Sequence, residues 1–195
     1  DRGDSFEDIS GDLTRGGVPG NVPFGTLTSL AEHPTKFGVL AAGSDDGLVH
    51  VSPDAGHSWK QLRLPLSTQL GKGKEAQHLW VSEVAWSRHD PELLVVALNG
   101  YRHDCLDAFL FATRDQGKTW SDWGQLLPHE PVNALVESAD REGWWVVGTD
   151  GGAYVTADGG ASFATLHRDL PNVPVHDLVI QERANELVLG THGRG

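Results

Sequence analysis

The stretch Ser52-Pro53-Asp54-Ala55-Gly56-His57-Ser58-Trp59 is one copy of the motif Ser/Thr-x-Asp-x-Gly-x-Ser/Thr-Trp/Phe, which decides the fold of this 195-residue chain. Further copies occupy residues 113–120 and 156–163, and a truncated copy, Asp1-Arg2-Gly3-Asp4-Ser5-Phe6, begins the sequence. The Asp side chain can accept hydrogen bonds from backbone N–H groups, the Gly can adopt left-handed backbone, and the aromatic ring can pack between sheets. We call this motif the Asp-turn and predict that each copy forms a tight turn.

The Asp-turns are predicted to be structural and not catalytic. A catalytic group has no reason to recur in every repeat, and the motif places no second carboxylate or base beside the Asp. The residues assigned this structural role are Asp1, Gly3, Phe6, Asp54, Gly56, Trp59, Asp115, Gly117, Trp120, Asp158, Gly160 and Phe163.

A second pattern repeats between the Asp-turns. Similar segments begin at Leu27, Val81, Val132 and Val175, and each is followed by a polar turn and a short apolar run. After the first three, a further apolar run leads into the next Asp-turn. Runs rich in Val, Leu and Trp that end at Gly, Asn or Asp are typical of buried strands. Four meandering strands per repeat are typical of a β-propeller blade.

The sequence therefore predicts an all-β fold, an arc of a β-propeller whose four-stranded antiparallel blades contain Asp-turn hairpins. Complete blades are expected at about 27–64, 81–124 and 132–166, with a blade remnant at 1–10 and a partial blade at 175–195. Because an arc exposes strand edges at both ends, we expect it to belong to a larger propeller, completed by the rest of a parent chain or by self-association.

Composition excludes several classes of function. The formal net charge of −12 disfavours nucleic acid as a partner, because nucleic-acid binders concentrate Lys and Arg on one face. No apolar stretch approaches the length of about 18 residues that a membrane-spanning helix needs, so membrane insertion is not expected. The single cysteine, Cys105, cannot form an internal disulfide, and the ten histidines are scattered without the spacing of a metal site. We therefore predict neither a metal nor another cofactor.

Two long loops are candidates for ligand binding. In a meandering blade the Asp-turns share one face with the turns between first and second strands, while the second-to-third turns and the links between blades lie on the opposite face. On that opposite face, the link from Pro65 to Trp80 carries Lys72 and Lys74. The hairpin at 99–107 is lengthened by polar and aromatic residues, which predicts a binding role for Tyr101, Arg102, His103 and Asp104.

Four further candidates lie near the start of the innermost strands, where side chains line the axis of a propeller. They are Glu83, Asn133, His176 and Asp177, and strand alternation lets only some of them point inward. Glu83 and Asp177 occupy the same register two blades apart, and glycoside hydrolysis uses a pair of carboxylates. The alternative interpretation is a solvated polar channel.

The Asp-turns resemble the Asp boxes of bacterial-neuraminidase-repeat proteins. The wider pattern resembles the bacterial relatives of the sortilin-type ten-bladed propellers, and it is carried by residues 43–51, 97–102, 174–178 and 190–195. This resemblance implies an extracytoplasmic, non-catalytic binding or scaffold propeller whose loops recognise a protein, a peptide or a glycan.

Two other functions stay open, because families with Asp boxes differ in activity. The first is a fragment of a glycoside hydrolase, although the sequence lacks the Arg-Ile-Pro motif of sialidases and no residue matches the catalytic Asp of xyloglucan hydrolases. The second is an assembly factor that chaperones a membrane complex. Such factors resemble this chain in their Asp boxes but carry a basic working face, which the acidity of this chain disfavours.

Overall fold

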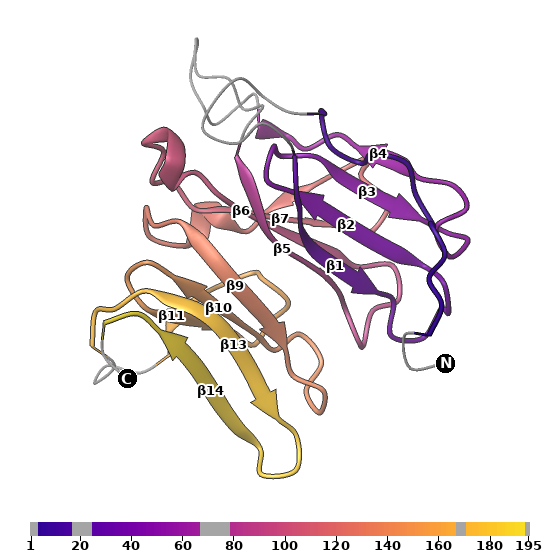
Figure 1. The fold of residues 1–195 in the computed structure, drawn as a ribbon. Helices are drawn as coiled ribbons and strands as arrows, with labels where there is room; N and C mark the ends of the chain where they lie inside the picture. Colours follow the sequence, from indigo (N-terminus) through magenta and orange to yellow (C-terminus); the bar gives the residue numbers. More distant parts are fainter. Residues whose placement is uncertain (1–3, 17–24, 67–78, 167–170, 194–195) are drawn as a thin grey trace.

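The computed structural model describes residues 4–16, 25–66, 79–166 and 171–193, whose strands form antiparallel sheets (Figure 1). Three of these sheets have four strands, which run in sequence order across the sheet, and the C-terminal sheet has two. The predicted all-β class of four-stranded antiparallel sheets is therefore confirmed.

The strands and two short 3-10 helices have the following bounds. The first sheet contains β1 (Leu27–Glu32), β2 (Leu40–Ser44), β3 (Val49–Ser52) and β4 (Lys60–Leu62). The second contains β5 (Trp80–Trp86), β6 (Leu94–Asn99), β7 (Phe109–Thr113) and β8 (Ser121–Asp122), with η3 (Tyr101–His103) in its central hairpin and η4 (Gly124–Leu126) after it. The third contains β9 (Val132–Glu137), β10 (Trp145–Thr149), β11 (Ala153–Thr156) and β12 (Ala164–Thr165), and the C-terminal sheet contains β13 (Val175–Gln181) and β14 (Glu186–Thr191).

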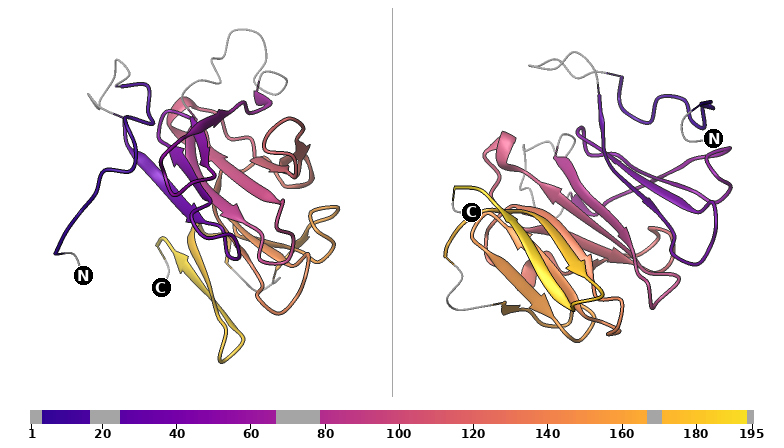
Figure 2. Two further views of the ribbon diagram at one scale, coloured as in Figure 1. Left: turned by 90° about the vertical axis from the view of Figure 1, so that its right-hand side faces the viewer. Right: turned by 60° about the horizontal axis from the view of Figure 1, so that its bottom comes forward.

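The sheets stack on one another in an arc, and apolar side chains fill the space between neighbours (Figures 1 and 2). Between the first and second sheets, Val49 and Leu62 pack in one core with Phe109 and Phe111. The second sheet is covered on both faces, so every residue of β6 and β7 is buried. In β14, by contrast, exposed and half-buried residues alternate.

A β-bulge interrupts the first strand of every sheet at the same place. The pairing skips one residue in each, and the skipped residues are Thr28, Ser82, Asn133 and His176. A bulge turns the side chain of the extra residue away from its usual direction. The Thr28 hydroxyl donates to the Val81 carbonyl at 2.6 Å, and the Ser82 hydroxyl donates to the Val132 carbonyl at 2.7 Å. The bulges therefore tie the first strands of neighbouring sheets together.

The Asp-turns connect the third and fourth strands of each complete sheet. In the second sheet, the Asp115 carboxylate accepts from the Thr119 amide at 2.9 Å and the Thr119 hydroxyl at 2.6 Å. The Thr113 hydroxyl donates to Asp115 at 2.9 Å and accepts from the Gly117 amide at 2.9 Å. Asp54 and Asp158 make the matching bonds in their own turns. These contacts, led by the Thr119 hydroxyl, lower the pKa of Asp115 to about 2.

Each turn has two consecutive left-handed residues, whereas the motif predicts only the Gly. The residue before the Gly also has positive φ, 58° at Ala55, 58° at Gln116 and 69° at Gly159. The amide of Ala55 donates to Gly38 in the β1–β2 turn at 2.7 Å, and that of Gly159 donates to Gly143 in the β9–β10 turn at 3.0 Å. These two kinds of turn therefore share one face of the molecule, which we call the Asp-turn face.

The Gly of each Asp-turn touches the preceding repeat. A Cβ on Gly56 would contact Ile9, one on Gly117 would contact Leu62, and one on Gly160 would overlap the Trp123 ring. Ile9, Leu62 and Trp123 each lie three residues after the aromatic residue of an Asp-turn. The N-terminal segment therefore packs on the first sheet at the position where the second and third sheets contact the end of the preceding repeat.

Phe6, the aromatic residue of the N-terminal Asp-turn copy, does not pack on a neighbouring repeat as the aromatic residues Trp59 and Trp120 of other copies do. The Trp59 indole donates to the Ile9 carbonyl at 3.0 Å and the Trp120 indole to the Arg63 carbonyl at 2.9 Å, so both rings contact the preceding repeat. Phe6, predicted to pack between sheets, is 94% exposed, because no strand among the described residues precedes it. Asp1 and Gly3 of this copy lie outside the described residues.

Candidate functional site

The face opposite the Asp-turns, which we call the loop face, carries the lengthened β6–β7 hairpin. Within it, η3 and the left-handed Asp104 (φ 51°) form a compact turn. All four predicted hairpin residues, Tyr101, Arg102, His103 and Asp104, are exposed. The Arg102 guanidinium lies 5.4 Å from the centroid of the Trp80 ring, at cation–π distance. This contact fixes the hairpin against the start of β5 and leaves the Tyr101 ring in solvent.

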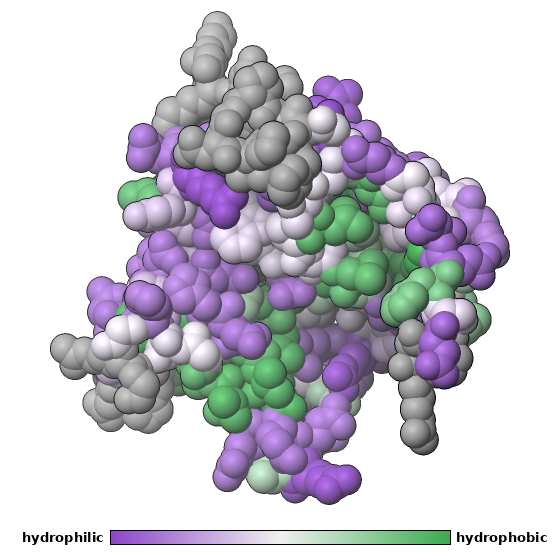
Figure 3. Space-filling view, in the orientation of Figure 1, coloured by the Kyte–Doolittle hydropathy of each residue, from purple (hydrophilic) through white to green (hydrophobic). Residues whose placement is uncertain are grey.

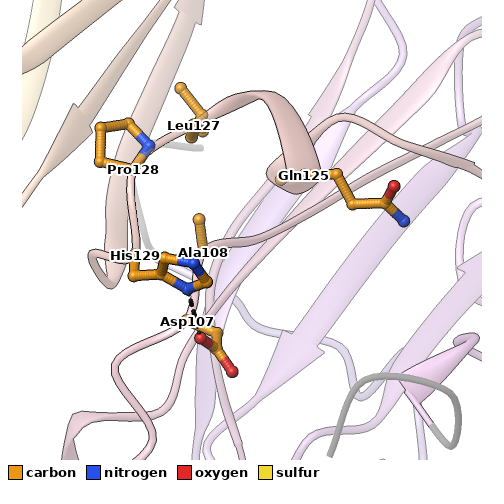
Figure 4. A pocket seen from close by; sticks show the side chains of 7 residues that line it. Asp107, Ala108, Gln125, Leu127, Pro128 and His129 are labelled. Carbon is orange, nitrogen blue, oxygen red and sulfur yellow. Dashed lines mark hydrogen bonds and ion pairs between the residues drawn. The ribbon is translucent and has the colours of Figure 1, made fainter.

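A pocket of about 220 Å³ lies between this hairpin and the link from β8 to β9 (Figure 4). Its lining residues are Asp107 and Ala108 of the hairpin and Gly124, Gln125, Leu127, Pro128 and His129 of the link. His129 Nδ1 and Asp107 Oδ1 are 2.7 Å apart. The side chain of His129 is 92% exposed, so this polar pair stands at the surface beside the pocket.

Exposed apolar side chains lie on the same two segments as this polar pair. Tyr101 is 66% exposed, Leu106 of the same hairpin 53%, and Leu126 of η4 48%. Two segments about 20 residues apart in the sequence thus line one pocket and also carry exposed apolar groups. Sequence reasoning selected the hairpin but missed the link, because the stretch 124–129 carries no unusual spacing or composition.

A chain of amide hydrogen bonds holds the hairpin to the third sheet. Asn99 Oδ1 accepts from the Tyr101 amide at 2.8 Å, and Asn99 Nδ2 donates to Asn133 Oδ1 at 2.7 Å. Asn133 Nδ2 in turn donates to Asp150 Oδ1 at 2.9 Å. Asn133 was predicted to line the axis for a ligand, but both its Oδ1 and its Nδ2 form hydrogen bonds within the protein. Its side chain positions the loops of two neighbouring sheets.

The predicted carboxylates Glu83 and Asp177 do come close enough to interact electrostatically. Glu83 Oε1 accepts from the Ser29 hydroxyl at 3.1 Å, and Ser29 Oγ accepts from the Val84 amide at 3.0 Å. Burial raises the pKa of Glu83, and the negative charge of Asp177 raises it further against the lowering effect of Ser29. The bulges explain this placement, because Ser29, Glu83 and Asp177 each follow a bulge residue.

Glu83 also lines a wider cavity of about 430 Å³ with Leu30, Glu32 and Trp86. Figure 3 shows apolar surface over β1 and over the β13–β14 sheet on either side of a hollow. Leu30 of β1 is 64% exposed, and Val179 of β13 is 52% exposed. The space between the first strands is therefore acidic at Glu83 and apolar at its sides.

The remaining candidates lie apart from these groups. His176 is exposed, and its ring centroid is 6.0 Å from that of His192, which directly follows β14. Lys72 and Lys74 lie outside the described residues. Within the described part of the chain, no group of three or more His, Cys, Asp or Glu residues is placed to hold a metal ion, and no helix is long and apolar enough to cross a membrane.

Comparison with solved structures shows which larger architecture these sheets resemble. No family model and no curated protein matches the sequence. Among solved structures, the GH74 xyloglucanase from Xanthomonas campestris is similar over 85% of this chain and 26% of its own, with a TM-score of 0.65 and 15% identity. The extracellular domain of a putative hybrid two-component system from B. thetaiotaomicron matches 92% of this chain and 21% of its own, with a TM-score of 0.62 and 17% identity.

A third similar structure is YCF48 bound to D1 peptide, which matches 90% of this chain and 49% of its own, with a TM-score of 0.56 and 13% identity. These neighbours are β-propellers. The chain has the fold of a partial β-propeller. It spans about a quarter of the xyloglucanase and half of YCF48, and at these identities the likeness concerns the fold alone.

In the propeller, the four sheets are blades, and their first strands β1, β5, β9 and β13 are the strands nearest the axis. The loop face and the Asp-turn face are the two ends of the propeller axis. The pocket at Asp107 and His129 therefore opens on one end, whereas Glu83 and Asp177 belong to the inner surface between the ends.

Proposed function

We propose that this propeller segment is a non-catalytic binding or scaffold module that holds a peptide or a segment of another protein on its loop face. The observation that carries the proposal is the pocket between the β6–β7 hairpin and the β8–β9 link. The pocket contains the hydrogen-bonded pair Asp107–His129, and the two segments that form it also carry the exposed side chains of Tyr101, Leu106 and Leu126. Exposed apolar groups that gather at one concave place are typical of interaction sites.

The chemistry of this surface favours a partner segment with an apolar anchor and basic neighbours. Aromatic side chains such as Tyr101 commonly contribute most of the binding energy at an interface. Asp104 and Asp107 lie in the hairpin and Glu130 lies at the end of the link, so the surface has several carboxylates near the pocket. Together with the net charge of −12, these carboxylates would accelerate association with a basic segment.

The structural neighbours support this class of function without specifying it. One of them was solved with a peptide bound, and another is the extracellular domain of a putative signalling system. A protein partner and an extracytoplasmic location are accordingly part of the proposal. A glycan at the loop face is the competing ligand, and the binding experiment separates the two.

The experiment selects peptides from a displayed random library on the immobilised protein and measures the affinity of an enriched peptide by fluorescence polarisation. Tyr101→Ala and Leu126→Ala should each weaken binding by at least about tenfold, since both remove exposed apolar contacts. Phe37→Ala is the matched control, because Phe37 is 94% exposed but lies in the β1–β2 turn on the Asp-turn face. Failure to enrich any peptide, or equal affinity in all three variants, would reject the loop-face site.

A glycoside hydrolase is the second candidate, favoured by the effect of the Asp177 charge on the half-buried Glu83 carboxyl. A carboxyl group whose pKa is raised by burial suits a general acid, and a second carboxylate is needed opposite it. The assay is release of reducing ends from xyloglucan. If the pair is catalytic, Glu83→Gln and Asp177→Asn should each abolish release, and a wild-type protein without activity removes this candidate.

We also propose that this arc works within a larger propeller, completed by further blades or by a second copy. Support comes from the C-terminal blade, where Val179 and Val188 are 52% and 55% exposed. Light scattering on this 195-residue chain tests the second-copy form of the proposal. A dimer of defined mass supports completion by self-association, and a stable monomer contradicts it.

A further inference from the structure

A separate cavity of about 200 Å³ lies between the first and second blades. Pro53 of the first Asp-turn, Gln116 of the second and Pro91 of the β5–β6 turn line it, so the cavity lies at the Asp-turn face. Among the described residues, none of the β6–β7 hairpin or of the β8–β9 link belongs to its lining. An inference about this cavity is therefore independent of the proposed function.

The walls of the cavity are apolar and carry several rings. Val51 of β3 and Leu62 of β4 are 9% and 4% exposed and belong to the core between the two blades. Trp86 of β5 packs against the same core, and its ring centroid is 5.2 Å from that of His33. Together with the two prolines named above, these side chains form walls on which a flat ring can pack.

Two lysines bring positive charge to the lining. Lys60 of β4 is exposed and pairs directly with Val51 of β3, so both side chains lie on the side of the sheet that faces the second blade. Among the described residues, the Lys60 ammonium has no ion-pair or hydrogen-bond partner. Lys36 Nζ donates to Glu92 Oε1 at 2.6 Å and to the Pro91 carbonyl at 3.2 Å, which uses two of its three donors.

The positive charge of the lining is balanced only in part. Glu92 is the single carboxylate among the described residues of the lining, and it is already paired with Lys36. His33 adds no charge, because its Nδ1 accepts from the amides of Thr35 and Lys36 at 3.1 and 3.0 Å. Its Nε2–H donates to the Pro91 carbonyl at 2.9 Å, as a neutral ring can. The lining therefore carries an excess of positive charge in a chain whose net charge is −12.

The apolar walls and the unpaired ammonium together define the chemistry of a ligand. A small inorganic anion would leave the walls uncovered, and an uncharged hydrocarbon would leave the Lys60 ammonium unused. An aromatic ring with one carboxylate matches both features, because the ring packs on the walls and the carboxylate accepts from an ammonium group. An apolar cavity of about 150 Å³ can hold benzene, so a cavity of about 200 Å³ suits one ring with a short substituent.

We propose that this cavity binds a small aromatic carboxylate, with its ring between Val51 and Trp86 and its carboxylate at Lys60. The third donor of the Lys36 ammonium is a second contact for the carboxylate. A singly charged ligand is favoured over a multiply charged one, because the Glu92 carboxylate also lines the cavity and repels negative charge. The ring thus supplies the apolar contact, and the single charge selects the orientation.

The cleft between the second and third blades provides an internal comparison with the opposite charge. The register is the same, because Trp86 pairs with Leu94 as Glu137 pairs with Trp145. At the positions of Lys36, Lys60 and Trp86, the second cleft carries Asp90, Ser121 and Glu137. Four carboxylates and one guanidinium are among the described residues that line its cavity of about 310 Å³. An anionic ligand should therefore bind in the first cleft and not in the second.

The test follows 4-fluorobenzoate by ¹⁹F NMR, with 4-fluorobenzamide as its uncharged analogue. Because each ligand has about ten heavy atoms, we expect saturable binding of 4-fluorobenzoate in about the millimolar range. The benzamide should bind at least about threefold more weakly, because it lacks the charge that the lysines recognise. Absence of saturable binding of 4-fluorobenzoate, or equal affinity for the two compounds, overturns the proposal.

Three variants check that such binding comes from the cavity. Lys60→Gln should weaken the affinity by at least about threefold, because it removes the unpaired ammonium. Lys118→Gln is the matched control, because Lys118 is exposed in the second Asp-turn and does not line the cavity. Val39→Trp should block the cavity that Val39 lines, and Trp144 already occupies the equivalent position of the third blade. Equal affinities in the two lysine variants, or binding that persists unchanged in folded Val39→Trp protein, would contradict the proposed site.

Discussion

Two adjacent glycines of the third Asp-turn give a sharp test of how the blades pack. Gly160 has φ of +86°, and a Cβ there would overlap the Trp123 ring of the preceding blade. Gly159 has φ of +69°, and a Cβ there would meet no atom within 4 Å. Gly160→Ala therefore combines left-handed strain of about 1–2 kcal/mol with overpacking of about 1–3 kcal/mol, a total of roughly 2–5 kcal/mol.

Gly159→Ala carries the strain alone, and its cost should be about 1 kcal/mol, because Ala55 already takes the equivalent position with φ of 58°. For a chain of this size, 1 kcal/mol lowers Tm by about 2–4 °C. Urea denaturation followed by tryptophan fluorescence, with thermal melts as a check, should give a clearly larger loss for Gly160→Ala. Equal losses in the two variants would show that the Asp-turn does not pack closely on the preceding blade.

Two further predictions concern pH. Asp115 has a pKa of about 2 in the folded protein, below the usual 3.8, so its stabilising contribution is complete above about pH 4 and is lost as the pH falls toward 2. Acid denaturation should accordingly be less steep in Asp115→Asn than in wild type, and identical pH profiles would contradict the hydrogen-bond set of the turn. Burial raises the pKa of Glu83 above the usual 4.5, so folding favours the protonated carboxyl group. The stability that Glu83 contributes in its protonated form is therefore lost as the pH rises through its pKa in the folded protein. Glu83→Gln should therefore be more stable than wild type at neutral pH, with the difference vanishing below about pH 4 in parallel urea titrations; a variant less stable at neutral pH would refute the burial of this carboxyl.

Much of the architecture was predictable because it repeats. The recurring Asp-turns and apolar runs specify antiparallel four-stranded sheets from local turn chemistry and strand alternation alone. The β-bulges were not predictable in this way, since the skipped residues Thr28 and Ser82 are set by how two strands pair. Yet Glu83 and Asp177 each follow a bulge residue, and the charge of Asp177 raises the pKa of Glu83.

The candidate site was only partly predictable, because it depends on contacts between distant segments. The lengthened hairpin around Tyr101 was visible as a departure from the repeat. Its partner His129 was not, since it lies in a link whose proximity to Asp107 follows from the packing of two blades. Similarly, the pairing of Glu137 with Trp145 requires the register of β9 and β10, which the sequence pattern does not specify.

The central claim is that the Asp-turn face maintains the fold while the loop face binds a partner. The most direct test measures peptide affinity and Tm side by side in Tyr101→Ala and Asp115→Asn. The account predicts opposite effects: Tyr101→Ala loses at least about tenfold in affinity with its Tm unchanged, and Asp115→Asn keeps the affinity with a lowered Tm. A folded Asp115→Asn protein that no longer binds the peptide, beside a Tyr101→Ala protein that still does, would contradict it.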